Sequence, residues 1–182
     1  MTVINDIDVQ VLQDTAAAVK ANPRLGQATF SVDGSWQGGC RLTAQTGALT
    51  QGGERDDSRV AKYVMSSDEP AALLGTDSAV SPGEYLLQAL AGCYTVTLAA
   101  LAAAQGIELK GFRLELEGDI DLRGFLGLDP TVRPGLQQVR VRLHIDADAP
   151  REQIDALVAL VENRSPIRDT LVSPVDVVTT LA

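Results

Sequence analysis

Cys93 is the side chain of this sequence with the clearest capacity for chemistry. It lies near the middle of the uncharged stretch 85–104, between Gly92 and Tyr94. A cysteine thiolate is a nucleophile, but a free cysteine in an apolar helix also behaves as a small hydrophobic residue. Composition leaves both interpretations open, because a reactive cysteine needs a partner that stabilises its thiolate.

Glu84 is the charged residue nearest to Cys93 along the chain. The two are nine residues apart, and at about 100° per residue this spacing places them on opposite faces of a straight helix, ~13 Å apart along its axis. Glu84 therefore does not touch the Cys93 of its own chain. It either completes a capping box with Ser81 or meets chemistry contributed by a second chain.

The remaining polar residues give no support for a cofactor or a metal. His144 is the only histidine and falls on the polar face of a predicted strand, so we expect it to be solvated. Asp119, Asp121 and Asp129 are too scattered for a calcium loop, and the chain has no glycine-rich phosphate loop and no nucleophile elbow. We therefore expect no cofactor and no metal.

The stretch 81–106 must position Cys93, and it predicts one long helix. Ser81 can cap it, Pro82 suits its first position and Gly106 marks its end. A helix that is apolar nearly all round is typical of a protein interior. One chain of this size would leave part of that surface uncovered, so we expect an obligate homodimer.

The sequence before this helix predicts a helix followed by an antiparallel sheet. The helix covers much of 4–19, within an N-terminal helical extension of residues 1–25. Three strands follow at 27–33, 35–46 and 59–65, with Asp33-Gly34 as a hairpin turn.

The sequence after it alternates as two half-buried strands at 113–122 and 139–146, which we expect to pair. A helix at 150–163 is interrupted at Ser165-Pro166, where Ser165 can cap a short second helix. A last strand is expected at 175–181. These elements give an α+β fold in one domain, residues 26–182.

Charge and composition bound the partners and the compartment. The 182 residues carry a net charge of -9 with no basic run, which argues against nucleic acid or an anionic membrane as partner. The start of the chain has no secretory signal, and two cysteines are too few for a disulfide framework, so we expect a cytoplasmic protein with reduced thiols. The central helix is a weak candidate for a membrane span, because it contains Gln88 and Gly92 and lacks basic flanks.

The motif Pro82-Gly83-Glu84, followed by Leu86-Leu87 and then 89–93 ending in Cys93, resembles the central helix of the OsmC/Ohr family. The order of the predicted elements agrees with that family from about Gly26 to the end. The resemblance implies an α+β fold in which two chains intertwine as a homodimer. The long central helices would pack between antiparallel sheets, with active sites at the subunit interface.

The resemblance also implies an activity. Family members reduce small organic hydroperoxides: a thiolate attacks the peroxide, becomes a sulfenic acid, and a second cysteine resolves it as a disulfide. Cys93 matches the peroxidatic position. Glu84 matches a glutamate that helps to hold an arginine near the thiol, and Arg41 is the best match for that arginine. The alternative for Arg41 is an ordinary charge on a strand face.

The chain departs from the family at Ser165, where the resolving cysteine would stand. Cys40 is not expected to replace it, because neighbours on a strand point in opposite directions and Arg41 is expected to face the thiol. Two hypotheses follow. The first is a one-cysteine thiol peroxidase involved in oxidative stress defence, with an external thiol as reductant. The second is a dimeric, non-catalytic protein that binds a small apolar ligand, with Cys93 in a structural role.

Overall fold

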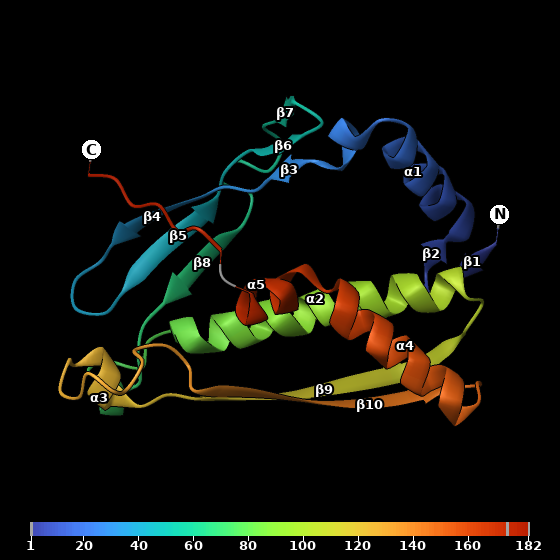
Figure 1. The fold of residues 1–182 in the computed structure, drawn as a ribbon. Helices are drawn as coiled ribbons and strands as arrows, with labels where there is room; N and C mark the ends of the chain where they lie inside the picture. Colours follow the sequence, from blue (N-terminus) through green and yellow to red (C-terminus); the bar gives the residue numbers. More distant parts are fainter. Residues whose placement is uncertain (1, 174, 182) are drawn as a thin grey trace. The chain divides into compact units, whose positions relative to one another are not determined.

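The computed structural model describes residues 2–173 and 175–181 and has the α+β fold expected from the sequence. Small antiparallel sheets accompany one long helix, α2 (Pro82–Ala104) (Figure 1). The chain forms two compact units. One contains the residues up to Val9 and those from Leu86 onward, and the other contains Gln10–Tyr85.

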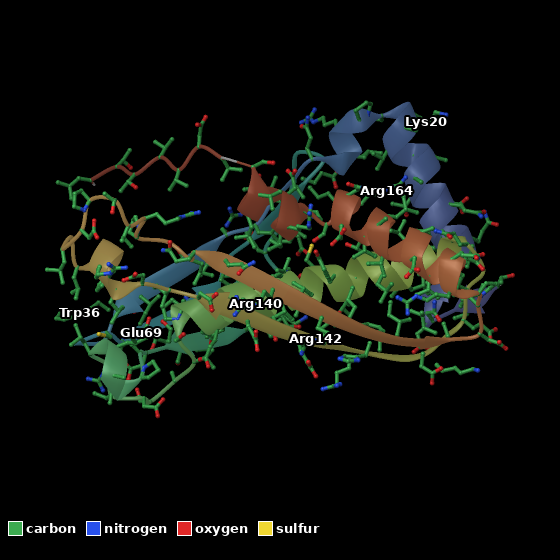
Figure 2. The ribbon with its side chains drawn as sticks, turned by 60° about the horizontal axis from the view of Figure 1, so that its bottom comes forward. Lys20, Trp36, Glu69, Arg140, Arg142 and Arg164 are labelled. Carbon is green, nitrogen blue, oxygen red and sulfur yellow. The ribbon has the colours of Figure 1, made fainter. Side chains whose placement is uncertain are left out.

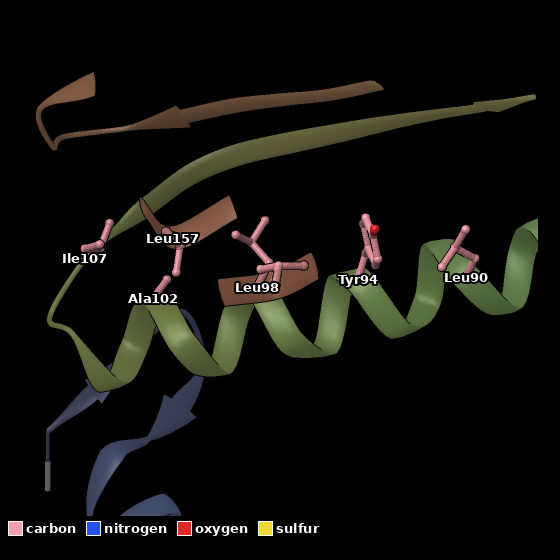
Figure 3. Close-up of a cluster of buried hydrophobic side chains, with 7 residues drawn as sticks. Leu90, Tyr94, Leu98, Ala102, Ile107 and Leu157 are labelled. Atoms are coloured by element: carbon pink, nitrogen blue, oxygen red, sulfur yellow. The ribbon is translucent and has the colours of Figure 1, made fainter. Parts of the chain in front are cut away.

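The first unit is built on α2 and a two-stranded ribbon, β9 (Leu109–Asp119) and β10 (Gln138–Ala147). The strands pair antiparallel, as predicted, with Leu114 opposite Leu143. The first of them begins and ends earlier than the predicted 113–122, because a short helix starts at Leu122. One face of α2 turns its buried side chains toward the ribbon at every fourth position (Figure 3). These side chains are Leu90, Tyr94, Leu98 and Ala102. The pattern follows from the helical repeat, because residues four apart lie on one face.

Helix α4 (Arg151–Arg164) packs on the same core through Leu157 and Val161, which are fully buried. The interruption expected at Ser165-Pro166 is present, and α5 (Pro166–Val172) begins there. Ser165 ends α4 and caps α5, with its hydroxyl oxygen accepting from the backbone N–H of Arg168 at 3.4 Å. A short helix, α3 (Leu122–Phe125), lies in the connection between β9 and β10.

The other face of the ribbon carries ion pairs. Arg140 pairs with Glu117 and Asp119, and Arg142 pairs with Glu115. Both arginines are labelled in Figure 2. His144 lies on this face as predicted, with Nε2 3.6 Å from Glu115. Exposed pairs of this kind contribute little to stability, because water screens them. They keep this face of the ribbon in water, while its apolar face packs on the core.

The second unit has two small sheets. The order of the first is β3-β6-β7, formed by Ala28–Thr29, Leu49–Gln51 and Glu54–Asp56. The order of the second is β4-β5-β8, formed by Val32–Trp36, Leu42–Thr46 and Val64–Ser67. Helix α1 (Val9–Ala21) and the short 3-10 helices η1 (Pro23–Gly26) and η2 (Ala71–Leu73) complete the helical elements of residues 10–81.

The N-terminal helix starts later than predicted. A hairpin of β1 (Val3–Ile4) and β2 (Ile7–Asp8) precedes it. Its two-residue turn consists of Asn5 and Asp6, which have φ of 55° and 58°. The Asn5 side chain donates to the carbonyl of Ile107 at 3.0 Å and accepts from the N–H of Leu109 at 2.8 Å. These tertiary hydrogen bonds hold the hairpin in place of a first helical turn.

The turn predicted at Asp33-Gly34 is wrong. Both residues lie within β4, and Gly34 is paired with Ala44 of β5. The chain turns instead at 37–41, where Gly38 and Gly39 have φ of 91° and 59°. Such positive values are accessible to glycine at little cost, so this pair forms the turn more readily than Asp33-Gly34 would.

Other strand predictions were also wrong. The strand expected at 27–33 is divided between β3 and β4, and the strand expected at 35–46 is interrupted by the turn at 37–41. The strand expected at 59–65 is present only from Val64, because Ala61 has φ of 53° and interrupts the extended backbone. The strand expected at 175–181 is absent from this described segment, which lies without a paired strand. Its apolar side chains are exposed, with Val177 and Val178 both 84% exposed. An alternating sequence needs a neighbouring strand to become a strand itself.

The loop before α2 is organised by Asp68. Its carboxylate is buried and accepts hydrogen bonds from Thr76 (backbone N–H 3.1 Å, hydroxyl 2.5 Å), from Ser78 (N–H 3.1 Å, hydroxyl 2.8 Å) and from the N–H of Glu69 at 2.8 Å. The hydroxyl of Thr76, more than any other donor, holds the pKa of Asp68 well below its usual range. Gly75 is needed here, because a Cβ would lie 1.7 Å from the carbonyl oxygen of Glu69.

We predict that Asp68→Asn lowers the free energy of unfolding at neutral pH. The pKa of Asp68 is lower in the folded chain than in the unfolded chain. Its contribution is therefore present above the unfolded value, about 4, and is lost as pH falls below it. The difference between wild type and Asp68→Asn should narrow between about pH 7 and about pH 3 in urea unfolding. Asp33→Asn, at an exposed position, is the control, and an equal difference for Asp68→Asn at both pH values would contradict the prediction.

Candidate active site

Cys93 is a free, half-buried cysteine on α2, and its sulfur lies at the start of α5. Two donors are directed at Sγ. The hydroxyl of Ser165 lies at 3.1 Å and the backbone N–H of Ile167 at 3.5 Å. The structure thus brings Cys93 together with Ser165, the residue at which the family resemblance places a second thiol.

The Ser165-Pro166 sequence explains why donors gather at this point. Proline has no N–H and disfavours a helical conformation in the residue before it. Ser165 accordingly has extended backbone, with φ of -75° and ψ of 113°. The first N–H groups of α5 have no partner within the helix and need other acceptors. Ile167 uses the sulfur of Cys93 as that acceptor, and Arg168 uses the hydroxyl of Ser165.

Tyr94 is a neighbour that the sequence did not identify as part of the site. It is 3% exposed, and burial raises the pKa of its hydroxyl. The guanidinium of Arg168 opposes that increase, while the carboxylate of Glu162 adds to it. Tyr94 also lines a pocket of about 340 Å³ between β10 and α4, whose walls include both apolar side chains such as Val158 and charged ones such as Glu162. The sequence signal that could have identified Tyr94 was its position directly after Cys93.

Glu84 forms the predicted capping box with Ser81. Its carboxylate accepts from the N–H of Ser81 at 2.9 Å, and the hydroxyl of Ser81 accepts from the N–H of Glu84 at 3.2 Å. These bonds satisfy two donors at the start of α2. A second role for Glu84, in holding an arginine, stays a prediction.

Arg41 and Cys40 lie at the end of the loop that joins β4 to β5. The Arg41 guanidinium donates to the carbonyls of Gln37 and Gly38, at 3.1 and 3.3 Å. Cys40 is exposed, and its thiol donates to the carbonyl of Leu74 at 3.4 Å. Both residues belong to the unit Gln10–Tyr85, whereas Cys93 belongs to the other. The proposed action of Arg41 on Cys93 therefore stays a prediction.

Comparison with known proteins places the chain in a family. The family model described as OsmC-like protein matches residues 75–180, which is more than half of the chain. This chain therefore belongs to the OsmC-like family, as its central motif predicted. A search of curated proteins finds no match.

Solved structures support the same fold. An OsmC-like protein from Mycoplasma pneumoniae aligns with a TM-score of 0.62 and 18% identity, over 80% of this chain and 89% of that one. A protein from Legionella pneumophila, described as an organic hydroperoxide resistance protein OsmC, aligns with a TM-score of 0.60 and 20% identity, over 81% and 92%. The organic hydroperoxide resistance protein OhrB of Bacillus subtilis aligns with a TM-score of 0.50 and 19% identity, over 81% and 93%.

The fold also bears on the apolar character of α2. By length and composition alone this helix could cross a membrane, but the core helix of a soluble protein passes the same test. Its row of buried side chains against the β9–β10 ribbon fits a core helix of the OsmC-like fold.

We predict that Ser165→Cys forms a disulfide with Cys93 under mild oxidation. The hydroxyl oxygen and the sulfur are 3.1 Å apart, so side-chain rotation and a shift of roughly 1 Å would reach the S–S bond length. The intact mass should fall by two hydrogens, and the thiols at positions 93 and 165 should no longer react with an alkylating reagent. The double variant Ser165→Cys, Cys93→Ser is the control, and persistence of both thiols in oxidised Ser165→Cys would count against the site geometry.

Proposed function

We propose that this protein is a thiol peroxidase of the one-cysteine type that reduces small organic hydroperoxides. The proposal rests on one observation: the sulfur of Cys93 accepts hydrogen bonds from Ser165 and Ile167 in an OsmC-like chain. Donors directed at sulfur stabilise the negative charge of a thiolate. Some neighbours in fold are named organic hydroperoxide resistance proteins, which supports the choice of substrate.

The reaction would proceed in two stages. The Cys93 thiolate attacks one peroxide oxygen, the O–O bond breaks, and the departing alkoxide takes a proton to become an alcohol. Cys93 is then a sulfenic acid. An external thiol attacks its sulfur, releasing water and leaving a mixed disulfide, which a second thiol reduces to restore Cys93. Ser165 cannot form an internal disulfide and Cys40 is not expected to form one, so the thiol that resolves the sulfenic acid would come from outside the chain.

Arg41 and Glu84 complete the proposed site. Arg41 would orient the peroxide and favour the thiolate, and Glu84 would hold the arginine in place. A guanidinium suits this task because its planar set of donors can bind an oxygen and remain charged. We further propose that this chemistry takes place in the cytoplasm, where external thiols are kept reduced.

We also propose that two chains form a homodimer. Helix α2 is uncharged from Tyr85 to Ala104, yet within one chain Val96 is 70% exposed. Exposed apolar surface on a helix of this kind is stabilised when a second copy covers it.

Light scattering at micromolar concentration should therefore give twice the mass of one chain. Val96→Asp should shift the protein toward monomer, because a carboxylate at an apolar interface would lose its hydration. Val11→Asp, at an exposed position of α1, is the matched control and should leave the mass unchanged. A monomer mass for the wild type would refute the homodimer.

Peroxide should oxidise Cys93 without trapping it as an internal disulfide. After one equivalent of an organic hydroperoxide, intact-mass analysis should show one added oxygen, peptide mapping should place it on the peptide that contains Cys93, and a sulfenic-acid reagent should react there. Excess peroxide should carry Cys93 on to the irreversible sulfinic acid. Cys93→Ser should consume no peroxide. Loss of two hydrogens between Cys40 and Cys93 would show instead that Cys40 resolves the sulfenic acid.

The alternative is a non-catalytic dimer that binds a small apolar ligand. The hydroxyl at Ser165 favours it, because a resolving thiol is missing. The pocket of about 340 Å³ beside Tyr94 offers such a ligand an apolar wall but is also lined by charged side chains, among them Arg142, Asp155 and Glu162. An unmodified Cys93 after peroxide treatment would refute the peroxidase and leave this alternative.

A further inference from the structure

We propose that Ser165 is a catalytic hydrogen-bond donor that holds Cys93 in its reactive, anionic form. The inference rests on the proposed peroxidase function and goes beyond it. At this position the chain would have replaced a resolving thiol with a group that activates the peroxidatic one. The alternative is that Ser165 acts only as the cap of α5.

The surroundings of Ser165 direct its hydroxyl proton toward sulfur. A serine hydroxyl has one proton to donate and two lone pairs that accept. The N–H of Arg168 donates to one of those lone pairs, at 3.4 Å. Ser165 is 1% exposed, so solvent does not compete for the proton. The acceptor that lies in front of it is the Cys93 sulfur, at 3.1 Å.

The same bond is worth more to the thiolate than to the thiol. A neutral thiol is a weak acceptor, whereas hydrogen bonds to an ionised group are shorter and roughly twice as strong. The N–H of Ile167 adds a second donor from the backbone, which substitution of its side chain would leave in place. Ser165 is therefore the one of these two donors that a side-chain substitution can remove.

Three titratable or charged groups lie near one another beside Cys93. They are Tyr94 on α2, Glu162 on α4 and Arg168 on α5. The guanidinium of Arg168 also donates to the carbonyl of Glu162 at 3.2 Å. A substitution at Ser165 leaves all three groups present, so the change that it makes near Cys93 is the loss of the hydroxyl, together with the cap that this hydroxyl gives to Arg168.

The test uses the full chain with Cys40→Ser, so that Cys93 is the remaining thiol. Alkylation by iodoacetamide is followed across pH, together with the ultraviolet absorbance of the thiolate. In Ser165→Ala the pH of half-maximal alkylation should rise by about one unit, which is about tenfold less thiolate at a given pH below that midpoint. Ser165→Thr, which keeps the hydroxyl, should restore the wild-type midpoint.

Thr97→Val is the matched control. The Thr97 hydroxyl donates to the backbone carbonyl of Cys93 at 2.8 Å, so this variant removes a hydroxyl that contacts the same residue but is not directed at its sulfur. Its midpoint should equal that of the wild type. Thermal unfolding of the Ser165 variants measures how much stability is lost with the cap of α5. If Ser165→Ala does not fold, Ser165→Gly makes the same test, since glycine is tolerated at helix caps.

An unchanged midpoint in Ser165→Ala or Ser165→Gly would overturn the inference and leave Ser165 as a cap. That result would not refute the peroxidase, provided that the wild type still consumes hydroperoxide. In contrast, a raised midpoint in a protein that consumes none would confirm the hydrogen bond, contradict the catalytic role of Ser165 and refute the proposed function. The two failures are thus distinguishable.

Discussion

The packing of one face of α2 against the β9–β10 ribbon is the constraint on which the candidate site depends. Leu90, Tyr94, Leu98 and Ala102 are buried at a spacing of four residues. They fix the rotation of the helix about its axis, because turning it would expose all of them together. Cys93 directly precedes Tyr94, about 100° around the helix. The core thus determines the direction in which the thiol points.

The break between α4 and α5 supplies the other half of the site. Leu157 and Val161 anchor α4 to the same core and are fully buried, so the end of α4 is held close to α2. Proline then ends the helical hydrogen bonding, and the first N–H groups of α5 are left to find acceptors. The sulfur of Cys93 accepts from Ile167, and the hydroxyl of Ser165 accepts from Arg168. The backbone feature that ends one helix therefore also creates the polar surroundings of Cys93.

The chain also shows how composition can overstate burial. A helix that is uncharged over 85–104 reads as buried on all sides, yet within one chain Val96 is largely exposed. The sequence records how much apolar surface the helix has, and it does not record which molecule covers that surface. An intertwined assembly would reconcile the two, since part of the core would then come from a second copy.

The sequence alone determined the elements whose signals are local. Ser81, Pro82 and Gly106 bound α2, alternation marked β9 and β10, and Ser165-Pro166 marked the break between α4 and α5. The domain division expected from the sequence stays a prediction. Together with the motif around Cys93, these signals were enough to predict the family and the α+β fold.

Tertiary structure decided what depends on distant partners. Asp33-Gly34 has the composition of a turn, but pairing with β5 keeps it extended, and the alternating segment 175–181 has no paired strand. The residues of the candidate site likewise divide into those that the sequence identified and those that only the structure revealed. Cys93 was identifiable from its residue type, and Ser165 from a family resemblance. The N–H of Ile167 was not, because a backbone donor has no sequence signature and acquires its role only when the fold brings an acceptor to it.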